Sequence, residues 1–192
     1  MLEWLSIDIE TTGLVSTRHQ MIEFGCVWDR GGDGVASFRA LVLHPDYVMN
    51  PYCVTLHTGL FAEINALPDL ELHVICDDDV AYSIACSYGE LGALFRGWLL
   101  RSGWDAVARF NVTGKNYATF DAAWVAPMLE DADVQVRSRV IDPAILYVRP
   151  GDNCLPDLDT CMQRAGLIIE GKRHTAVYDA LCVSRLLRRA GL

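Results

Sequence analysis

Ser6-Ile7-Asp8-Ile9-Glu10-Thr11-Thr12-Gly13-Leu14 is the stretch on which the interpretation of the whole chain depends. Apolar residues alternate with polar ones from Leu5 to Glu10, which is the period of a β-strand with one buried face. The same alternation places the carboxylates of Asp8 and Glu10 on one side. We therefore expect a central strand that presents two acids next to each other.

Two ionised carboxylates that lie close together raise one another's pKa unless a positive charge lies between them. A hard divalent cation, held by carboxylates together with substrate phosphate, meets that need. Two solvated acids at the end of a strand would leave the same pattern, because a short motif is weak evidence. The choice between these readings depends on the later segments.

The composition predicts one globular domain over residues 1–192. Apolar residues make up 52% and the mean hydropathy is +0.19, enough for a packed core. No run of 18 apolar residues and no basic leader is present, so we expect neither a membrane span nor a secretory signal, and a cytoplasmic protein. The seven cysteines include no Cys-x-x-Cys pair and are expected to pack rather than to form disulfides or bind zinc.

The net charge of −9 argues against sequence-blind binding along a long nucleic acid, because that affinity comes from many Lys and Arg side chains on phosphates. The charge is unevenly distributed. Residues 1–134 carry seven basic and 19 acidic side chains, whereas residues 135–192 carry nine and six. The C-terminal part could therefore tolerate a phosphate chain.

The order of elements predicts an α/β protein. Three antiparallel strands are expected first, then a mixed segment and an alternation of helices and strands. Residues 77–79 form an acidic run, which we expect to be solvated and to precede a helix. The other expected elements are strands at 21–28, 35–43, 104–112 and 140–142 and helices near 59–66, 87–100, 118–130, 156–166 and 174–190.

Two later segments carry chemistry like that of the first. They are Gly114-Lys115-Asn116-Tyr117-Ala118-Thr119-Phe120-Asp121 and His174-Thr175-Ala176-Val177-Tyr178-Asp179-Ala180. With the N-terminal stretch they resemble, in order, the three motifs of the DnaQ-like 3′–5′ exonucleases, from Leu5 to about Leu187. A histidine five positions before the last aspartate is similar to the DEDDh subclass; the tyrosine variant would need Tyr at 175.

The resemblance implies a ribonuclease H-like fold: a mixed sheet of three antiparallel strands followed by parallel ones, with flanking helices. It also implies that four carboxylates hold two Mg²⁺ ions, for which Mn²⁺ would substitute, with Asp8 as the bridging ligand. His174 is then the general base that takes a proton from the attacking water, since imidazole titrates near neutrality. The implied metal ligands are Asp8, Glu10, Asp121 and Asp179.

An exonuclease must also hold the terminal nucleotide. The loop Thr11, Thr12, Gly13 and Leu14 is expected to do this, with Gly13 allowing close approach and Leu14 against the base. Asn116, Tyr117 and Phe120 are further candidates for substrate contact; Tyr117 is a candidate stacking platform, and core packing explains Phe120 equally well. The remaining histidines are expected on the surface or as satisfied core residues: His19, His44, His57 and His73.

The sequence thus predicts a 3′–5′ exonuclease that acts on the 3′ end of nucleic acid, with single-stranded DNA favoured, and releases nucleoside monophosphates. One alternative is trimming of RNA or oligoribonucleotides, and residues 68–89 are a segment that could influence this choice. Another is a non-catalytic nucleic-acid or polymerase-binding module, against which the complete set of acids and His174 argues. A polymerase or homodimer partner stays open.

Two other enzyme classes lack their signatures. A phosphate loop would need glycine at 109 and Ser or Thr at 116, where the chain has Arg109 and Asn116. A serine hydrolase would need glycine two residues before Ser87, where the chain has Ala85.

Overall fold

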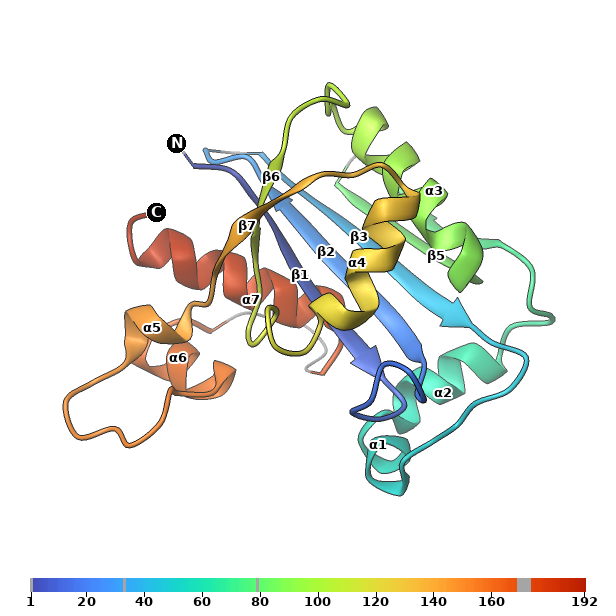
Figure 1. Ribbon diagram of the computed structural model, residues 1–192, viewed down its shortest axis with the longest axis horizontal. Helices are drawn as coiled ribbons and strands as arrows, with labels where there is room; N and C mark the ends of the chain where they lie inside the picture. The colour runs from blue at the N-terminus through green and yellow to red at the C-terminus, as the bar shows by residue number, and fades with distance from the viewer. Residues whose placement is uncertain (1, 33, 79, 169–173) are drawn as a thin grey trace.

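β1, Trp4–Thr11, lies inside a mixed sheet of seven strands, between β2 and β6 (Figure 1). The computed structural model describes residues 2–32, 34–78, 80–168 and 174–192, and within them the strand order is β4-β5-β3-β2-β1-β6-β7. β1, β2 and β3 are antiparallel neighbours, whereas β6 and β7 continue the sheet parallel to β1. The other strands are β2 Met21–Asp29, β3 Val35–Leu43, β4 His73–Asp77, β5 Ala81–Ser87, β6 Phe110–Thr113 and β7 Val136–Ile141.

Helices cover both faces of the sheet (Figure 1). α3 and α4 pack on one face over the main core, and α7 packs on the other face against β1 and β2. α6 lies beside α7 at one end, and α1 and α2 follow the end of β3. The helices are α1 Pro51–Leu56, α2 Thr58–Asn65, α3 Tyr88–Arg101, α4 Ala122–Asp131, α5 Ala144–Tyr147, α6 Leu158–Ala165 and α7 Ala176–Arg189.

The alternation predicted for β1 is confirmed by its contacts. Its odd-numbered apolar residues lie in the core under α3 and α4. On the other face, the Trp4 indole donates to Ser184 Oγ at 3.2 Å and the Ser6 hydroxyl donates to the carbonyl of Ala180 at 2.7 Å, both in α7. Asp8 follows in the same row, so β1 directs its acids toward the N-terminal end of α7.

The start of α7 rests directly on the backbone of β2. Gly25 pairs with Asp8, and a Cβ at Gly25 would lie only 2.2 Å from the carbonyl carbon of Ala176. Glu23 Oε2 accepts a hydrogen bond of 2.7 Å from the Ala176 N–H. Arg39 in turn pairs with Glu23, which is fully buried. A glycine and a buried carboxylate therefore place the first turn of α7.

The acidic run at 77–79 does not precede a helix, which corrects that prediction. β4 and β5 form a hairpin, and Asp78 Oδ1 accepts hydrogen bonds from the N–H groups of Val80 and Ala81 at 2.8 and 2.6 Å. Asp77 and Asp78 are exposed, as expected; Asp79 lies outside the described residues. The prediction failed because an Asp side chain that closes a turn and one that begins a helix leave the same local pattern.

Other boundaries also differ from expectation. Strand β6 is short because Asp105 Oδ1 closes a turn by accepting from Val107 and Ala108. The helix expected from 118 begins at Ala122, because the residues before it form a turn in which the Thr119 hydroxyl donates to Asn116 O. The mixed segment holds two helices rather than one, β7 begins four residues earlier than expected, and α5 was not predicted.

All seven cysteines are free. Five are buried, as expected of packing residues, but Cys76 is half-buried and Cys154 is exposed. No helix in the described ranges is both long and apolar enough to cross a membrane.

Candidate active site

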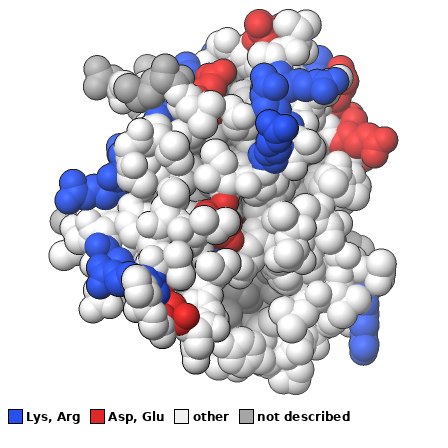
Figure 2. All heavy atoms as spheres, turned by 60° about the vertical axis from the view of Figure 1, so that its left-hand side comes forward, with Lys and Arg blue, Asp and Glu red and all other residues white. Residues whose placement is uncertain are grey.

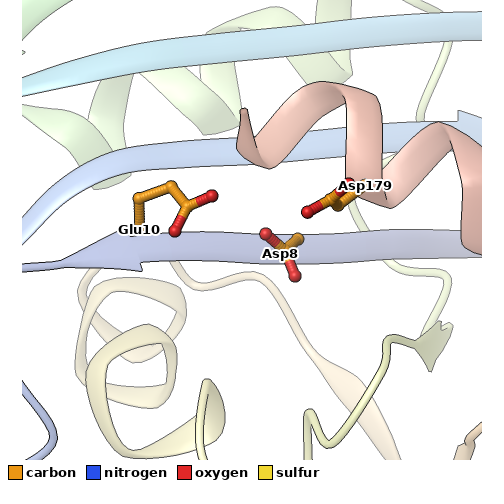
Figure 3. Close-up of side chains that lie close together, drawn as sticks. All are labelled: Asp8, Glu10 and Asp179. Carbon is orange, nitrogen blue, oxygen red and sulfur yellow. The ribbon is translucent and has the colours of Figure 1, made fainter. Parts of the chain in front are cut away.

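Three of the predicted metal ligands meet where β1 faces the first turn of α7 (Figure 3). Asp8 and Glu10 come from β1, and Asp179 comes from α7. One carboxylate oxygen from each lies within 4.8 Å of the others. All three side chains are half-buried, so their oxygens are both crowded and reachable.

Asp121 reaches the same place from α4. It occupies the N-cap position, is 2% exposed, and its Oδ1 accepts a 3.1 Å hydrogen bond from the Ile9 N–H. That bond fixes the carboxyl at the edge of β1, next to the three other acids but outside their 4.8 Å group.

A hollow of about 410 Å³ contains all four acids. It is lined by Asp8, Ile9, Glu10, Lys115, Asn116, Thr119, Phe120, Asp121, His174 and Asp179. The fold therefore brings three distant sequence motifs into a single cavity.

His174 is exposed and lies on the rim of this hollow, immediately before Thr175, the N-cap of α7. Its φ of 59° is in the left-handed region, which residues other than glycine seldom adopt. Such conformations persist where the surrounding structure imposes them and are enriched at functional sites. Residues 169–173, just before it, lie outside the described part of the chain.

The site has the electrostatics of a cation-binding centre. Burial, together with the nearby charges of Asp121, Glu10 and Asp179, holds the pKa of Asp8 well above its usual value. Burial and neighbouring acids raise the pKa of Glu10 to about 8, and burial raises that of Asp121 to about 7. A positive charge would relieve this repulsion, and a set of carboxylate oxygens is the donor set that hard divalent cations prefer.

We expect the metal-free protein to lose stability as the pH rises. Glu10 and Asp121 have higher pKa values in the folded chain than in the unfolded chain, so above about pH 5 the folded chain binds more protons. The free energy of unfolding therefore decreases as the pH rises, until the pH exceeds about 8 and both groups are ionised in either state. Between pH 6.5 and 8.5 this should lower the melting temperature by roughly 5 °C. Calorimetry in EDTA measures it, and excess Mg²⁺ should restore most of the loss. A melting temperature in EDTA that does not change with pH would contradict the prediction.

Solved structures share this architecture. E. coli exonuclease I in complex with a dT13 oligonucleotide matches with a TM-score of 0.61 and 15% identity, over 98% of this chain and 40% of that chain. The zinc-bound form of the E. coli exonuclease I complex with single-stranded DNA gives the same values. S. pombe Pop2p, in a form with Mg²⁺ and Mn²⁺ bound, matches with a TM-score of 0.57 and 14% identity, over 95% of this chain and 80% of that chain.

The fold is ribonuclease H-like, as the sequence motifs implied. No protein-family model and no curated protein matches the sequence. The chain spans about two fifths of the exonuclease I chains it matches. With identities of 14–15%, the structural match shows a shared fold alone, and activity has to be argued from the site itself.

His57 belongs to the site, although we predicted it as a surface or satisfied core residue. It is 4% exposed, its Nε2 lies 3.5 Å from Glu10 Oε2, and its Nδ1 is buried without a hydrogen-bond partner. Burial and the charge of His174 lower the pKa of His57. Sequence reasoning missed this residue because only the packing of α2 against β2 and β3 brings it to Glu10.

Side-chain hydrogen bonds hold the loop after β1 in place. The Thr11 hydroxyl donates to Gly13 O, and Thr12 is fully buried with its hydroxyl bonded to Gln20. Both side chains therefore stabilise the conformation of the loop. Gly13 is needed because a Cβ there would lie 2.3 Å from the His19 ring. Only Leu14, 72% exposed, offers an apolar surface of the expected kind.

The three candidates in the second motif differ in how exposed their side chains are. Tyr117 is 5% exposed and lies within the main core, so little of its ring is open for stacking. Asn116 is exposed, lines the hollow and has a φ of 61°. Phe120 is half-buried; it packs against Trp124 with ring centroids 4.7 Å apart and also lines the hollow.

Glu23 was not among the predicted site residues. Its pKa is raised by burial and held down in part by Arg39 and by the hydrogen bond from Ala176. The available signal was its position: a charged residue two positions before Gly25 lies on the same face of β2, opposite Glu10.

Proposed function

We propose that the chain is a metal-dependent 3′–5′ exonuclease that hydrolyses single-stranded DNA from its 3′ end and releases nucleoside monophosphates. The observation that carries the proposal is the convergence of Asp8, Glu10 and Asp179 within 4.8 Å, with Asp121 and His174 lining the same hollow. Hydrolysis of a phosphodiester needs an activated water and stabilised charge on the phosphoryl oxygens.

Each residue then has a role in the reaction. Asp8, Glu10, Asp121 and Asp179 would hold two Mg²⁺ ions, or Mn²⁺ in their place. When bound, such ions act as Lewis acids toward phosphoryl oxygens. His174, exposed at the rim, accepts the proton of the attacking water. Leu14 supplies an apolar contact for the terminal base, and Asn116 lies where it can donate to the sugar or phosphate.

The choice of DNA rests on weaker support. The E. coli exonuclease I structures were solved with dT13, dA13 and dA16 oligonucleotides, which concerns those proteins and suggests the substrate to test first. Binding along a long duplex requires many phosphates to be neutralised by Lys and Arg. A chain with a net charge of −9 can neutralise few phosphates at once, which favours a single-stranded end over a long duplex.

The test uses matched DNA and RNA 15-mers, labelled at the 5′ end, with free or paired 3′ ends and with Mg²⁺, Mn²⁺ or EDTA. We expect a ladder of products shortened from the 3′ end on single-stranded DNA, with a nucleoside monophosphate as the released product, and none in EDTA. Faster degradation of RNA would assign the enzyme to RNA trimming. Binding without cleavage of any strand would support the non-catalytic module instead.

His174→Ala should reduce kcat by about 10²- to 10⁴-fold near pH 7, since general-base catalysis contributes about that factor. The decline of the rate on the acidic side of the wild-type pH profile should disappear, while Mg²⁺ binding measured by calorimetry should persist. His73→Ala is the matched control, because His73 lies on β4 at the opposite edge of the sheet. A variant that keeps the wild-type pH–rate profile would remove His174 from this role.

A further inference from the structure

A basic surface lies along β7, away from the hollow. Arg109, Arg137 and Arg139 border a groove of about 620 Å³ together with Leu2, Asn111 and Ser138. All three arginines are exposed. Arg39, Arg96, Arg164 and Arg188 pair with acids, whereas these three arginines have no acidic partner among the described residues. We call this surface the β7 groove.

The β7 groove lies on the sheet face that carries the catalytic acids. Thr113 of β6 pairs with Ser6 of β1 and with Ile141 of β7, so the side chains of these three point to one face. Ser6 is bonded to α7, and Asp8 follows it on the same side. Arg139 lies two residues before Ile141 and shares its face. The register shifts between the Phe110–Val136 and Val112–Val140 pairs, but Val136 and Val140 both pack against the main core, so Arg137 lies with Arg139 on the other face.

The register also gives the distance from the acids. Ile141 of β7 lies level with Ser6 of β1, and Arg139 is two residues before Ile141. Asp8 is two residues after Ser6, so Arg139 and Asp8 are about 13 Å apart in the direction of the strands. β7 is two strands from β1, which adds about 10 Å across the sheet. This separation exceeds the reach of one nucleotide and suits the continuation of a strand whose end occupies the hollow.

One basic side chain, Lys115, lies on the side of the hollow nearest to β7. Asp142, directly after β7, accepts a 3.0 Å hydrogen bond from the Asn116 N–H, and Lys115 Nζ lies 3.8 Å from the same carboxylate. Lys115 and Asn116 line the hollow. On the side of the molecule shown in Figure 2, a small acidic group lies near the centre, with Lys and Arg side chains above it and to its left.

We propose that the β7 groove binds the phosphates of a single-stranded nucleic acid whose 3′ end lies in the hollow. This inference rests on the proposed exonuclease function. Arginine suits the task because its guanidinium donates to phosphate in a fixed geometry and stays charged. A second copy of the chain is the poorer occupant: pairing at the β7 edge would bring Arg137 and Arg139 close to their own copies, and like charges opposite each other destabilise a sheet.

The test compares Arg137→Glu, Arg139→Glu and the double variant with wild type on dT15 and on the dinucleotide dTdT. We expect KM for dT15 to rise at least tenfold in the double variant at 0.1 M salt, with kcat and all dTdT kinetics unchanged. The salt dependence of dT15 binding should weaken by roughly 0.7 in log–log slope for each arginine. Arg101→Glu is the charge-matched control; Arg101 ends α3 on the opposite face, over Tyr82.

Equal effects on dT15 and dTdT, no effect on dT15, or the same effect from Arg101→Glu would overturn the proposal. A change of oligomeric state in sedimentation would do so as well, since it would make the β7 edge a protein interface. Fluorescence anisotropy of labelled dT15 in EDTA measures binding without cleavage, so it tests the β7 groove independently of the proposed exonuclease function. If wild type binds dT15 through the arginines but cuts nothing, the exonuclease function fails and the groove stands.

Discussion

Asp8→Asn should abolish nearly all exonuclease activity, by at least about 10³-fold, which corresponds to about 4 kcal/mol of transition-state stabilisation. The amide keeps the shape of the carboxyl but removes its charge from the point where β1 and α7 meet. Asp8 is the acid whose pKa is raised by Asp121, Glu10 and Asp179 together, so it interacts with every other member of the site. Its loss should therefore cost more than the loss of a peripheral acid.

The same variant separates catalysis from stability. Removing one of several mutually repelling buried carboxylates should leave the melting temperature in EDTA at pH 8 unchanged or raise it, because burial opposes the charged form of Asp8. The rise in melting temperature on addition of Mg²⁺ should shrink. Asp46→Asn, at an exposed position in the loop after β3, is the control and should change neither value. An Asp8→Asn enzyme with wild-type turnover would refute the metal-ligand assignment.

Much of the fold could be predicted because its signals are local. The alternation in β1 is a property of six consecutive residues, and the three motifs lie in the order that the ribonuclease H-like fold requires. The β4–β5 hairpin was missed because its turn is closed by the side chain of Asp78, which a sequence pattern does not distinguish from a helix cap. Element boundaries failed where single side-chain hydrogen bonds decide them, as at Asp105 and Thr119.

Some features of the candidate site could likewise be predicted from local sequence and others could not. The five predicted catalytic residues line one hollow. Their motifs lie on β1 and at the starts of α4 and α7, and the fold brings these three places together. Burial could not be predicted residue by residue. Tyr117 and Thr12 lie in the interior because of what packs over them, and His57 reaches Glu10 only because α2 packs against β2 and β3. Their roles depend on tertiary contacts and not on spacing along the chain.

Gly25→Ala should lower activity by at least about 10²-fold, although Gly25 would touch neither metal nor substrate. Its new Cβ would stand 2.2 Å from the carbonyl carbon of Ala176 and 2.3 Å from the Val177 nitrogen. These are backbone atoms, which cannot rotate away as the end of a side chain can. The first turn of α7 must move outward by about 1 Å or more, carrying Asp179 with it, and displacements of that size in an active site cost about 10²-fold.

The expected cost in stability is smaller and has its own control. Overpacking of this kind destabilises by about 1–3 kcal/mol, or a melting temperature lower by roughly 2–12 °C for a chain of this length. Gly89→Ala makes the same chemical change in α3, where a Cβ meets nothing within 4 Å, and should be neutral or slightly stabilising. Activity should be compared well below both melting temperatures, so that unfolding does not contribute. If Gly25→Ala unfolds earlier yet keeps its kcat, the contact between β2 and α7 supports the fold without positioning Asp179.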